Sequence, residues 1–199
     1  KSDNIAKKYL IKELRVFKEF IEEKFHVSIT DDNLIAAIEL SNKIKQTCRQ
    51  LNNLRKIKNI PNEDFFSTMK FCIENERSQV LSFLRATKNE WEQKGDIPSE
   101  KISIFLTGSD ILQKNWYQIL ERVGLRVIRD DQSIGERYFS NEIPNGKTPL
   151  ERLASYYLNY ITPAPKHHLH HRLDYIIKAV KNDSIKGVIS QNVKFCETF

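Results

Sequence analysis

Two segments of this sequence carry residue types suited to ligand binding or redox chemistry. Thr107, Gly108 and Ser109 follow an apolar run. The glycine would let the backbone approach a ligand, and the helix expected next would offer free N–H groups. Near the end of the chain, Lys194 precedes Cys196 by two residues, and a nearby cation favours the thiolate form of a cysteine. Each signal is weak alone, because such turns are common and a single cysteine is usually inert.

A third segment of this kind, residues 130–138, reads DDQSIGERY. Its candidate binding residues are Asp131, Gly135 and Arg137, because an arginine can hold an anionic group through two parallel hydrogen bonds. The other interpretation is structural, with the two aspartates capping the loop and pairing with Arg129 or Arg137. The sequence leaves both interpretations open.

Four histidines in residues 165–172 form another candidate site. His167 and His171 are four residues apart, a spacing that can place two metal ligands on one helix face. No HExxH-type acid accompanies them and a Pro-rich turn borders them, so an exposed helix start is the favoured interpretation. The sequence contains neither GxxxxGK[ST] nor GxGxxG, and nothing fixes a histidine beside Ser109 or Cys196 for nucleophilic catalysis.

Positive charge is concentrated in the first third of the chain. The net charge is +6, and residues 1–60 hold 13 Lys and Arg against 8 Asp and Glu. Residues 43–58 contain six basic residues and no acidic one. Such a run can meet phosphates of nucleic acid or of a nucleotide-like ligand, although a solvated helix face is the commoner origin. No aromatic residue interrupts it, so we expect no nucleic-acid partner.

Composition indicates a globular protein. The chain has 199 residues, of which 40% are hydrophobic and 29% charged, with six Gly and six Pro, which excludes collagen-like, low-complexity and fully disordered classes. Its apolar runs are far shorter than the roughly 20 residues that span a bilayer, and the start shows no secretion signal. The three cysteines are odd in number and widely spaced, which argues against a disulfide framework and for a reducing interior. We therefore expect a cytoplasmic protein without a membrane partner, and its abrupt ends indicate a piece of a longer one.

The elements that must position these residues differ between the two halves of the chain. Residues 1–98 show the three- to four-residue apolar spacing of helices. The first such stripe comprises Ile5, Tyr9, Leu10, Leu14, Phe17, Ile21 and Phe25. Thr30 has the residue type of an N-cap for the second helix, and a third stretch, 63–91, has a candidate break at 74–78. Cys48 and Cys72 lie on apolar stripes, which indicates buried structural thiols.

Residues 99–199 alternate between strand and helix patterns. Short apolar runs at 102–106, 125–128 and 187–190 predict strands, and helical patterns separate them. This order implies right-handed crossovers and a parallel sheet. The predicted fold is therefore α/β, with an all-helical region (1–98) followed by an open, Rossmann-like parallel sheet with flanking helices (99–199). Ligands bind outside the carboxyl ends of such strands, where all three candidate segments emerge.

The succession of these motifs resembles the 2-hydroxyacyl-CoA dehydratase D-component family, which also includes benzoyl-CoA reductase subunits. The resemblance is carried by TGS at 107–109, VIRDDQSIGERYF at 127–139 and RLDYIIKAVKNDSIKGVISQNVKFCETF at 172–199. Residues 8–43 are similar to the middle helical region of that family. The most specific element is DDxxxGxRYF followed at the right distance by GVI and KFC.

The resemblance implies an oxygen-sensitive iron–sulfur protein with two Rossmann-like lobes joined by helices. Residues 1–98 would then be connecting helices and 99–199 the beginning of the second lobe. Family members bind a [4Fe-4S] cluster through three cysteines in each subunit, and the cysteine of the KFC motif, here Cys196, is one of them. In the dehydratases, an ATP-hydrolysing activator injects one electron, and the resulting ketyl radical permits elimination of the 2-hydroxyl group.

Further roles are predicted for the other candidate residues. Ser109 and Arg137 are the predicted catalytic residues. The predicted cofactor-binding residues are Thr107, Gly108, Ser109, Asp131 and Gly135. Backbone N–H groups of the turn would face a thioester or CoA group, and Arg137 would hold an anionic substrate group.

The sequence departs from the family pattern in its cysteines. The other two cluster cysteines of the family belong to the first lobe, which this chain lacks, and Cys48 and Cys72 do not match them. Ser133 and Ala164 stand where the family often has cysteine. We therefore expect that this chain alone does not hold the cluster.

Three functions follow as alternatives. The first is a fragment of a dehydratase subunit that acts through Cys196. The second is an ATP-driven reductase of the benzoyl-CoA or double-cubane type, and the third is a non-catalytic partner or activator-docking module. The expected partners are an acyl-CoA substrate, an ATP-dependent activator, and a related subunit or a second copy of the chain.

Overall fold

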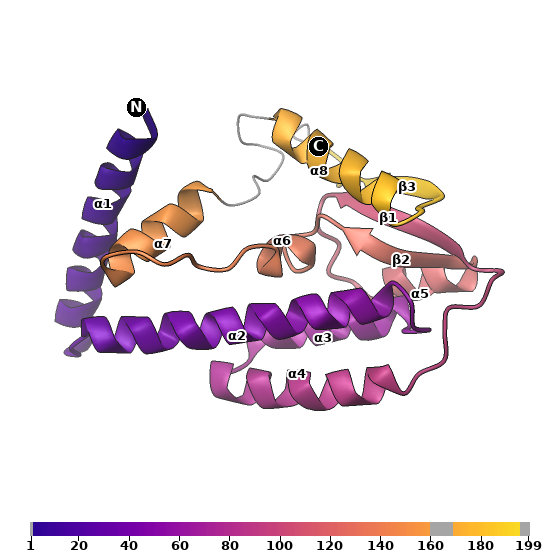
Figure 1. Cartoon of the computed structure of the whole chain (residues 1–199), viewed down its shortest axis with the longest axis horizontal. Coiled ribbons are helices and arrows are strands. Elements are labelled where there is room, and N and C mark those ends of the chain that lie inside the picture. The colour runs from indigo at the N-terminus through magenta and orange to yellow at the C-terminus, as the bar shows by residue number, and fades with distance from the viewer. Residues whose placement is uncertain (1, 160–168, 196–199) are drawn as a thin grey trace. The chain divides into compact units, whose positions relative to one another are not determined.

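The computed structural model describes residues 2–159 and 169–195 (Figure 1). These residues form eight helices and three strands, which confirms the predicted α/β class. In chain order they are α1 (Ser2–Phe25), α2 (Asp31–Arg55), α3 (Asn62–Glu74), α4 (Arg77–Glu92), β1 (Ile102–Gly108), α5 (Lys114–Arg122), β2 (Leu125–Asp130), α6 (Glu136–Phe139), α7 (Pro149–Leu158), α8 (Leu169–Asn182) and β3 (Gly187–Gln191). Among the described helices, none is both long and apolar enough to cross a membrane.

The chain divides into two compact units. The first comprises Lys1–Lys43 and Asn141–Tyr160, and the second comprises Ile44–Ser140 and Ile161–Phe199. The sequence-based boundary at residue 98 separates the helical part of the chain from the part that contains the strands. As a domain boundary it stays a prediction.

The first unit is a small helical assembly in which α1 packs against α7. Its apolar centre contains Ile38, Ile143 and Tyr156. Asn42 binds the backbone of Ile143 twice, since its side chain donates to the carbonyl at 3.0 Å and accepts from the N–H at 2.8 Å. At the start of α2, the Thr30 hydroxyl accepts from the Asn33 N–H at 3.2 Å, as the N-cap prediction requires.

The apolar pattern of α1 does not form the single buried stripe that the sequence predicted. Leu10, Leu14 and Ile21 are partly buried, whereas Ile5 and Tyr9 are largely exposed. At about 100° per residue, these two side chains lie on the opposite side of the helix from Leu14. The helix therefore has two apolar faces, of which one is exposed.

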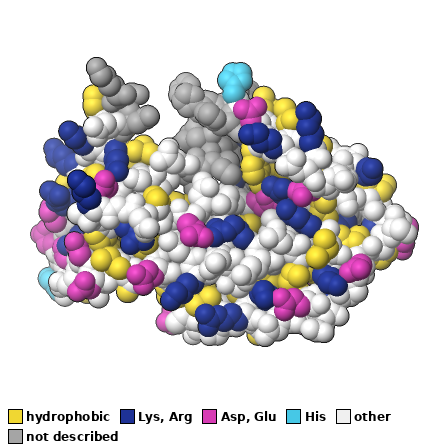
Figure 2. Space-filling model, in the orientation of Figure 1, with side chains coloured by type: hydrophobic (Ala, Val, Ile, Leu, Met, Phe, Trp, Pro, Cys, Tyr) yellow, Lys and Arg dark blue, Asp and Glu magenta, His cyan; other side chains and the backbone are white. Residues whose placement is uncertain are grey.

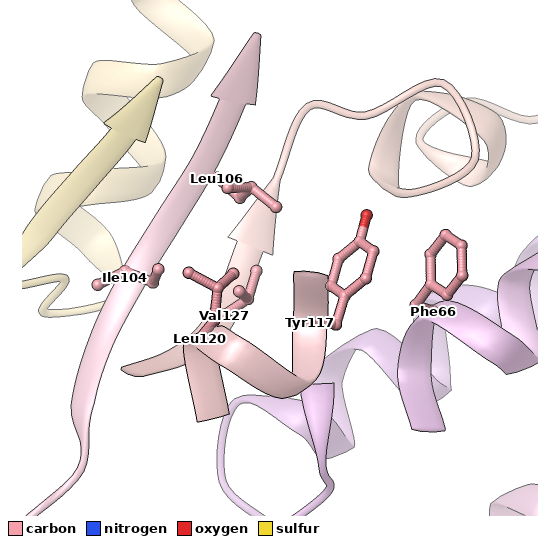
Figure 3. Close-up of a cluster of buried hydrophobic side chains, with 6 residues drawn as sticks. All are labelled: Phe66, Ile104, Leu106, Tyr117, Leu120 and Val127. Atoms are coloured by element: carbon pink, nitrogen blue, oxygen red, sulfur yellow. The ribbon is translucent and has the colours of Figure 1, made fainter. Parts of the chain in front are cut away.

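The second unit is built around the three-stranded sheet. The strand order is β2-β1-β3, and both pairings are parallel, which confirms the predicted parallel sheet. One face, shown in Figure 3, packs Ile104, Leu106 and Val127 against Tyr117 and other residues of α3 and α5. The opposite face packs other side chains of β1 and β2 against α8 (Figure 1). Alternate residues of β1 serve the two faces, as the two-residue period of a strand requires.

The two cysteines of the helical region are part of the core. Cys48 on α2 and Cys72 on α3 are buried, and their sulfur atoms lie 4.0 Å apart. The contact with Cys72, together with burial, raises the pKa of the Cys48 thiol. This placement confirms that both are structural thiols. The predicted break near residue 74 is also present, because α3 ends at Glu74 and α4 begins at Arg77.

Candidate functional site

The carboxyl ends of the three strands lie side by side at one edge of the sheet. In the strand register, Leu106 is opposite Asp130 and Gly108 is opposite Gln191. The segments that follow β1, β2 and β3 therefore leave the sheet at the same edge, where ligands of open parallel sheets bind. Cys196 lies outside the described residues, which continue as far as residue 195.

The turn after β1 is fastened to the segment after β3. Gly108 has a φ of +103°, and a Cβ atom there would lie 2.0 Å from the Gln191 carbonyl oxygen. The Ser109 N–H donates to the same carbonyl at 2.7 Å, and the Ser109 hydroxyl accepts from the Val193 N–H at 3.2 Å. Thr107 to Ser109 therefore hold the beginning of the segment that leads to Cys196.

Asp131 is the most deeply buried acidic residue at this edge. Its Oδ2 accepts from Nε of Arg172 at 2.6 Å, and Nη2 of Arg172 donates to the Thr107 hydroxyl at 3.0 Å. Its second oxygen, Oδ1, has no hydrogen-bond partner among the described residues. A buried acceptor without a partner is costly, so this oxygen is the unusual feature of the carboxylate.

Arg137 is also buried and incompletely paired. Its Nη2 donates to the Ser133 hydroxyl at 3.2 Å and lies 3.8 Å from Oδ2 of Asp110. Its Nε has no hydrogen-bond partner within the described part of the chain. Asp110 also accepts from the Ser133 N–H at 2.7 Å, so it joins the loop after β2 to the turn after β1. Sequence reasoning missed Asp110, although it directly follows the Thr-Gly-Ser turn.

Asp130 organises the loop that contains the candidate residues. Its Oδ1 accepts from the N–H groups of Gln132 at 3.0 Å and Glu136 at 2.8 Å. Its Oδ2 accepts from Nη2 of Arg55 at 2.6 Å. A Cβ atom on Gly135 would lie 2.0 Å from Oδ1 of Asp130, so the glycine is needed for the loop to close over the carboxylate.

These contacts test the structural interpretation of the two aspartates. The capping role is confirmed for Asp130. The predicted pairing of the two aspartates with Arg129 or Arg137 is wrong in the described structure, because Asp130 pairs with Arg55 and Asp131 with Arg172. Both arginines come from helices far away in the sequence.

A network of charged groups extends this arrangement beneath the loop. Oε1 of the buried Glu136 accepts from Nε of Arg129 at 2.7 Å and lies 3.2 Å from Nη2 of Arg55. The Tyr175 hydroxyl donates to the other oxygen of Glu136. Burial and the Glu136 charge raise the pKa of Tyr175, so this hydroxyl keeps its proton. The network joins α2, β2, α6 and α8, and sequence reasoning missed it.

The described residues supply few groups that suit a metal. Among them, no three His, Cys, Asp or Glu side chains are grouped closely enough to hold a metal ion. Cys48 and Cys72 are buried, with their sulfur atoms in contact between α2 and α3. His167 lies outside the described residues, and the side chain of His171 is not described either.

Comparison with known proteins identifies the family. The family model of the 2-hydroxyglutaryl-CoA dehydratase D-component matches residues 2–199. The chain belongs to this family. It is 24% identical to a benzoyl-CoA reductase subunit of Thauera aromatica, over 98% of this chain and 52% of that protein. It is 23% identical to the (R)-phenyllactyl-CoA dehydratase beta subunit of Clostridium sporogenes, over 96% of this chain and 52% of that protein.

Membership in the D-component family confirms the resemblance found in the sequence. The chain spans about half the length of these two curated relatives. One relative is named as a reductase subunit and the other as a dehydratase subunit, at almost the same identity. The family therefore includes both dehydratase and reductase subunits, and sequence identity does not choose between the two for this chain.

Proposed function

We propose that this chain is part of a 2-hydroxyacyl-CoA dehydratase subunit in which Cys196 is one ligand of a [4Fe-4S] cluster at the carboxyl edge of the sheet. The observation that carries the proposal is the attachment of the segment after β3. Ser109 binds the backbone at Gln191 and Val193, three residues before Cys196. Family membership supports the same position, since the KFC motif is a cluster motif in the family that the chain resembles.

The cluster would supply one electron to the thioester carbonyl after activation by an ATP-dependent protein. The residues of this chain would bind and orient the substrate. Asp131 would accept a hydrogen bond through Oδ1, and Arg137 would donate one through Nε; both atoms are buried and have no partner among the described residues. A hydroxyl or amide of an acyl-CoA suits the first group, and a carbonyl or carboxylate suits the second.

The contacts of Ser109 favour a positioning role over direct catalysis. Its N–H donates to the Gln191 carbonyl and its hydroxyl oxygen accepts from the Val193 N–H, so both groups hold the segment after β3. Gly108 packs against Gln191 and Gly135 against Asp130, and Thr107 orients Arg172. We therefore propose that these residues shape the site, while Asp131 and Arg137 contact its ligand.

The alternative function is an ATP-driven reduction of the benzoyl-CoA type. The similarity to the benzoyl-CoA reductase subunit of Thauera aromatica supports it. Both functions use an acyl-CoA substrate, an ATP-dependent activator and a related subunit, and we propose these as partners in the cytoplasm. Product analysis separates the two, since a dehydratase releases a 2-enoyl-CoA and a reductase releases a ring-reduced product.

The cluster proposal is tested on the complete subunit together with its partner subunit, reconstituted without oxygen. We expect Cys196→Ala to lose iron and sulfide in this subunit and the corresponding electron paramagnetic resonance signal. Cys48→Ala is the matched control and should retain both, because Cys48 lies in the core of the helices. Unchanged cluster content in Cys196→Ala would refute the proposal, and a metal-free wild-type complex would favour the docking-module alternative.

A further inference from the structure

The basic segment of the second helix has a polar side as well as an apolar one. Four polar side chains follow the spacing i, i+3, i+4, i+7, which places residues on one side of a helix: Arg49, Asn52, Asn53 and Lys56. Leu51 lies about 200° around the helix from Arg49 and is fully buried. Because the apolar side of α2 supplies the core, the polar side is not needed for apolar packing.

These four polar side chains line a cavity of about 220 Å³ in the second unit. Arg129 of β2 and Tyr175 of α8 line it as well. The side chains of Lys56 and Arg129 are 23% and 14% exposed, so they are only partly solvated. Figure 2 shows Lys and Arg side chains, with Asp and Glu side chains beside them, on the surface between α8 and the second half of α2.

Positive charge exceeds negative charge in this cavity. Among the described residues that line it, three side chains are basic and one, Glu136, is acidic. Both oxygens of Glu136 are engaged, Oε1 by Nε of Arg129 and Oε2 by the Tyr175 hydroxyl. Behind the lining, Nζ of Lys56 lies 3.4 Å from Asp183, farther than the roughly 2.7–2.9 Å of a close charged hydrogen bond. Lys56 can therefore turn to a stronger anion.

The uncharged groups of the cavity add hydrogen-bond donors. Asn52 accepts from Nε of Arg55 through Oδ1 at 2.7 Å, so the group that it can offer to a ligand is the donor Nδ2. Asn53 is exposed at the same cavity and carries a second side-chain amide. A group with several acceptor oxygens and a negative charge suits such a lining.

We propose that this cavity binds a phosphate group of a nucleotide-type ligand. Phosphate oxygens accept charge-assisted hydrogen bonds from arginine and lysine, and α2 together with β2 supplies both residue types here. The volume is below the roughly 300–1,000 Å³ of pockets that enclose whole small molecules. The cavity therefore takes the phosphate end of a ligand rather than the whole molecule. An acyl-CoA and a free nucleotide both carry such an end.

The cavity lies beside the candidate site but uses other residues. Tyr175 of the cavity is three residues after Arg172 on α8, and Arg172 pairs with Asp131. Where the ligand is an acyl-CoA, the inference rests on the proposed function and adds the place of its phosphate end. The two fail separately, because phosphate binding is measured without electron transfer and the cluster is measured as iron and sulfide.

The first test measures the binding of four probes by equilibrium dialysis against the complete subunit with its partner subunit. The probes are coenzyme A, ATP, inorganic phosphate and pantetheine, which carries no phosphate. We expect at least one of the first three to bind, with an affinity that falls as salt is added. Binding of coenzyme A alone identifies the substrate as the source of the phosphate group, whereas binding of ATP or inorganic phosphate identifies a free nucleotide or free phosphate.

The second test changes the charge of the cavity. Asn53→Asp adds a negative charge at an exposed position, and we expect the dissociation constant of the phosphate probe to rise on the order of tenfold at low salt. Lys56→Gln should act in the same direction. Gln50→Glu is the matched control, because Gln50 is an exposed amide of α2 outside the lining; it should bind like the wild type. Circular dichroism establishes that each variant is folded.

A third measurement reports on the cavity itself. Lysines are acetylated with and without the probe and are then identified by peptide mass spectrometry. A bound probe should protect Lys56 but not Lys88, whose side chain is similarly exposed at 29%.

Three results would overturn the inference. The first is that no phosphate-bearing probe binds to the wild type. The second is that Asn53→Asp and Lys56→Gln both bind every such probe as tightly as the wild type does. The third is equal protection of Lys56 and Lys88 by a bound probe.

Discussion

The edge of the sheet and the surface of α1 depart from the usual distribution of residues in opposite ways. At the sheet edge, Arg55, Asp130, Asp131 and Glu136 are buried, whereas on α1 large apolar residues such as Phe20 are exposed. Most charged residues of a folded protein are exposed and most large apolar residues are buried, so buried charges and rows of exposed apolar residues call for an explanation. At the edge most partners come from the same chain. On α1 such side chains have no apolar cover among the described residues of the first unit.

The largest loss of stability is expected at the buried charge network. Arg55→Ala leaves Asp130 and Glu136 without one of their cations, and loss of one partner of a buried pair costs about 3–5 kcal/mol. We expect the free energy of unfolding, measured with urea, to fall by that amount. Lys88→Ala, which removes only the surface pair with Glu92, should change it by less than about 1 kcal/mol. Equal effects of the two substitutions would contradict a buried network.

A second effect should appear where the turn after β1 meets the segment after β3. Gly108→Ala places a methyl group against the Gln191 carbonyl in a backbone conformation that disfavours side chains, and overpacking of this kind costs roughly 1–3 kcal/mol. Gly95→Ala is the matched control, because no atom lies within 4 Å of its Cβ position. We expect the thermal unfolding midpoint to fall in Gly108→Ala and to stay unchanged in Gly95→Ala. If Gly108→Ala unfolds like the wild type, the turn is not held as described.

The third prediction concerns pH and a partly buried charge. Burial would raise the pKa of Glu121, but hydrogen bonds from Lys101 and the Asn62 N–H, with the Arg126 charge, outweigh burial and lower the pKa below 4.5. A lowered pKa stabilises the fold above the ordinary pKa, and this contribution disappears as pH falls through the folded value. The destabilisation by Glu121→Gln, at most about 1 kcal/mol, should therefore shrink below pH 4.5.

Urea unfolding of wild type and Glu121→Gln at several pH values between neutral and acid checks this prediction. The exposed Glu100→Gln is the control for a change of net charge without loss of these contacts. The prediction is contradicted if the difference in free energy of unfolding between wild type and Glu121→Gln grows as the pH falls.

The smallest effect is expected on α1. Because Phe20 is mostly exposed within the chain, Phe20→Ser should change the free energy of unfolding of the monomer by less than about 0.5 kcal/mol. Chemical unfolding at a concentration too low for association measures this quantity. A loss comparable to that of Arg55→Ala would show that Phe20 packs within the fold.

Local sequence patterns were sufficient to predict much of the fold and to indicate the family. The apolar spacing predicted the helices and strands, and their alternation predicted the parallel sheet, because periodicity and crossover handedness act over short stretches of chain. The DDxxxGxRYF block and the KFC motif indicated the family. The predicted roles of Cys196, Ser109 and Arg137 in chemistry stay predictions.

What the sequence by itself determined is therefore the order of the elements, the edge at which the candidate residues emerge, and the buried position of Cys48 and Cys72. Only the tertiary structure decided the partners of the aspartates. Arg55 lies 75 residues before Asp130, and Arg172 lies 41 residues after Asp131. Such pairs depend on how the helices cross the sheet, which residue spacing along the chain does not encode. The same reason applies to α1, where only the position of α7 shows which apolar face is covered and which is exposed.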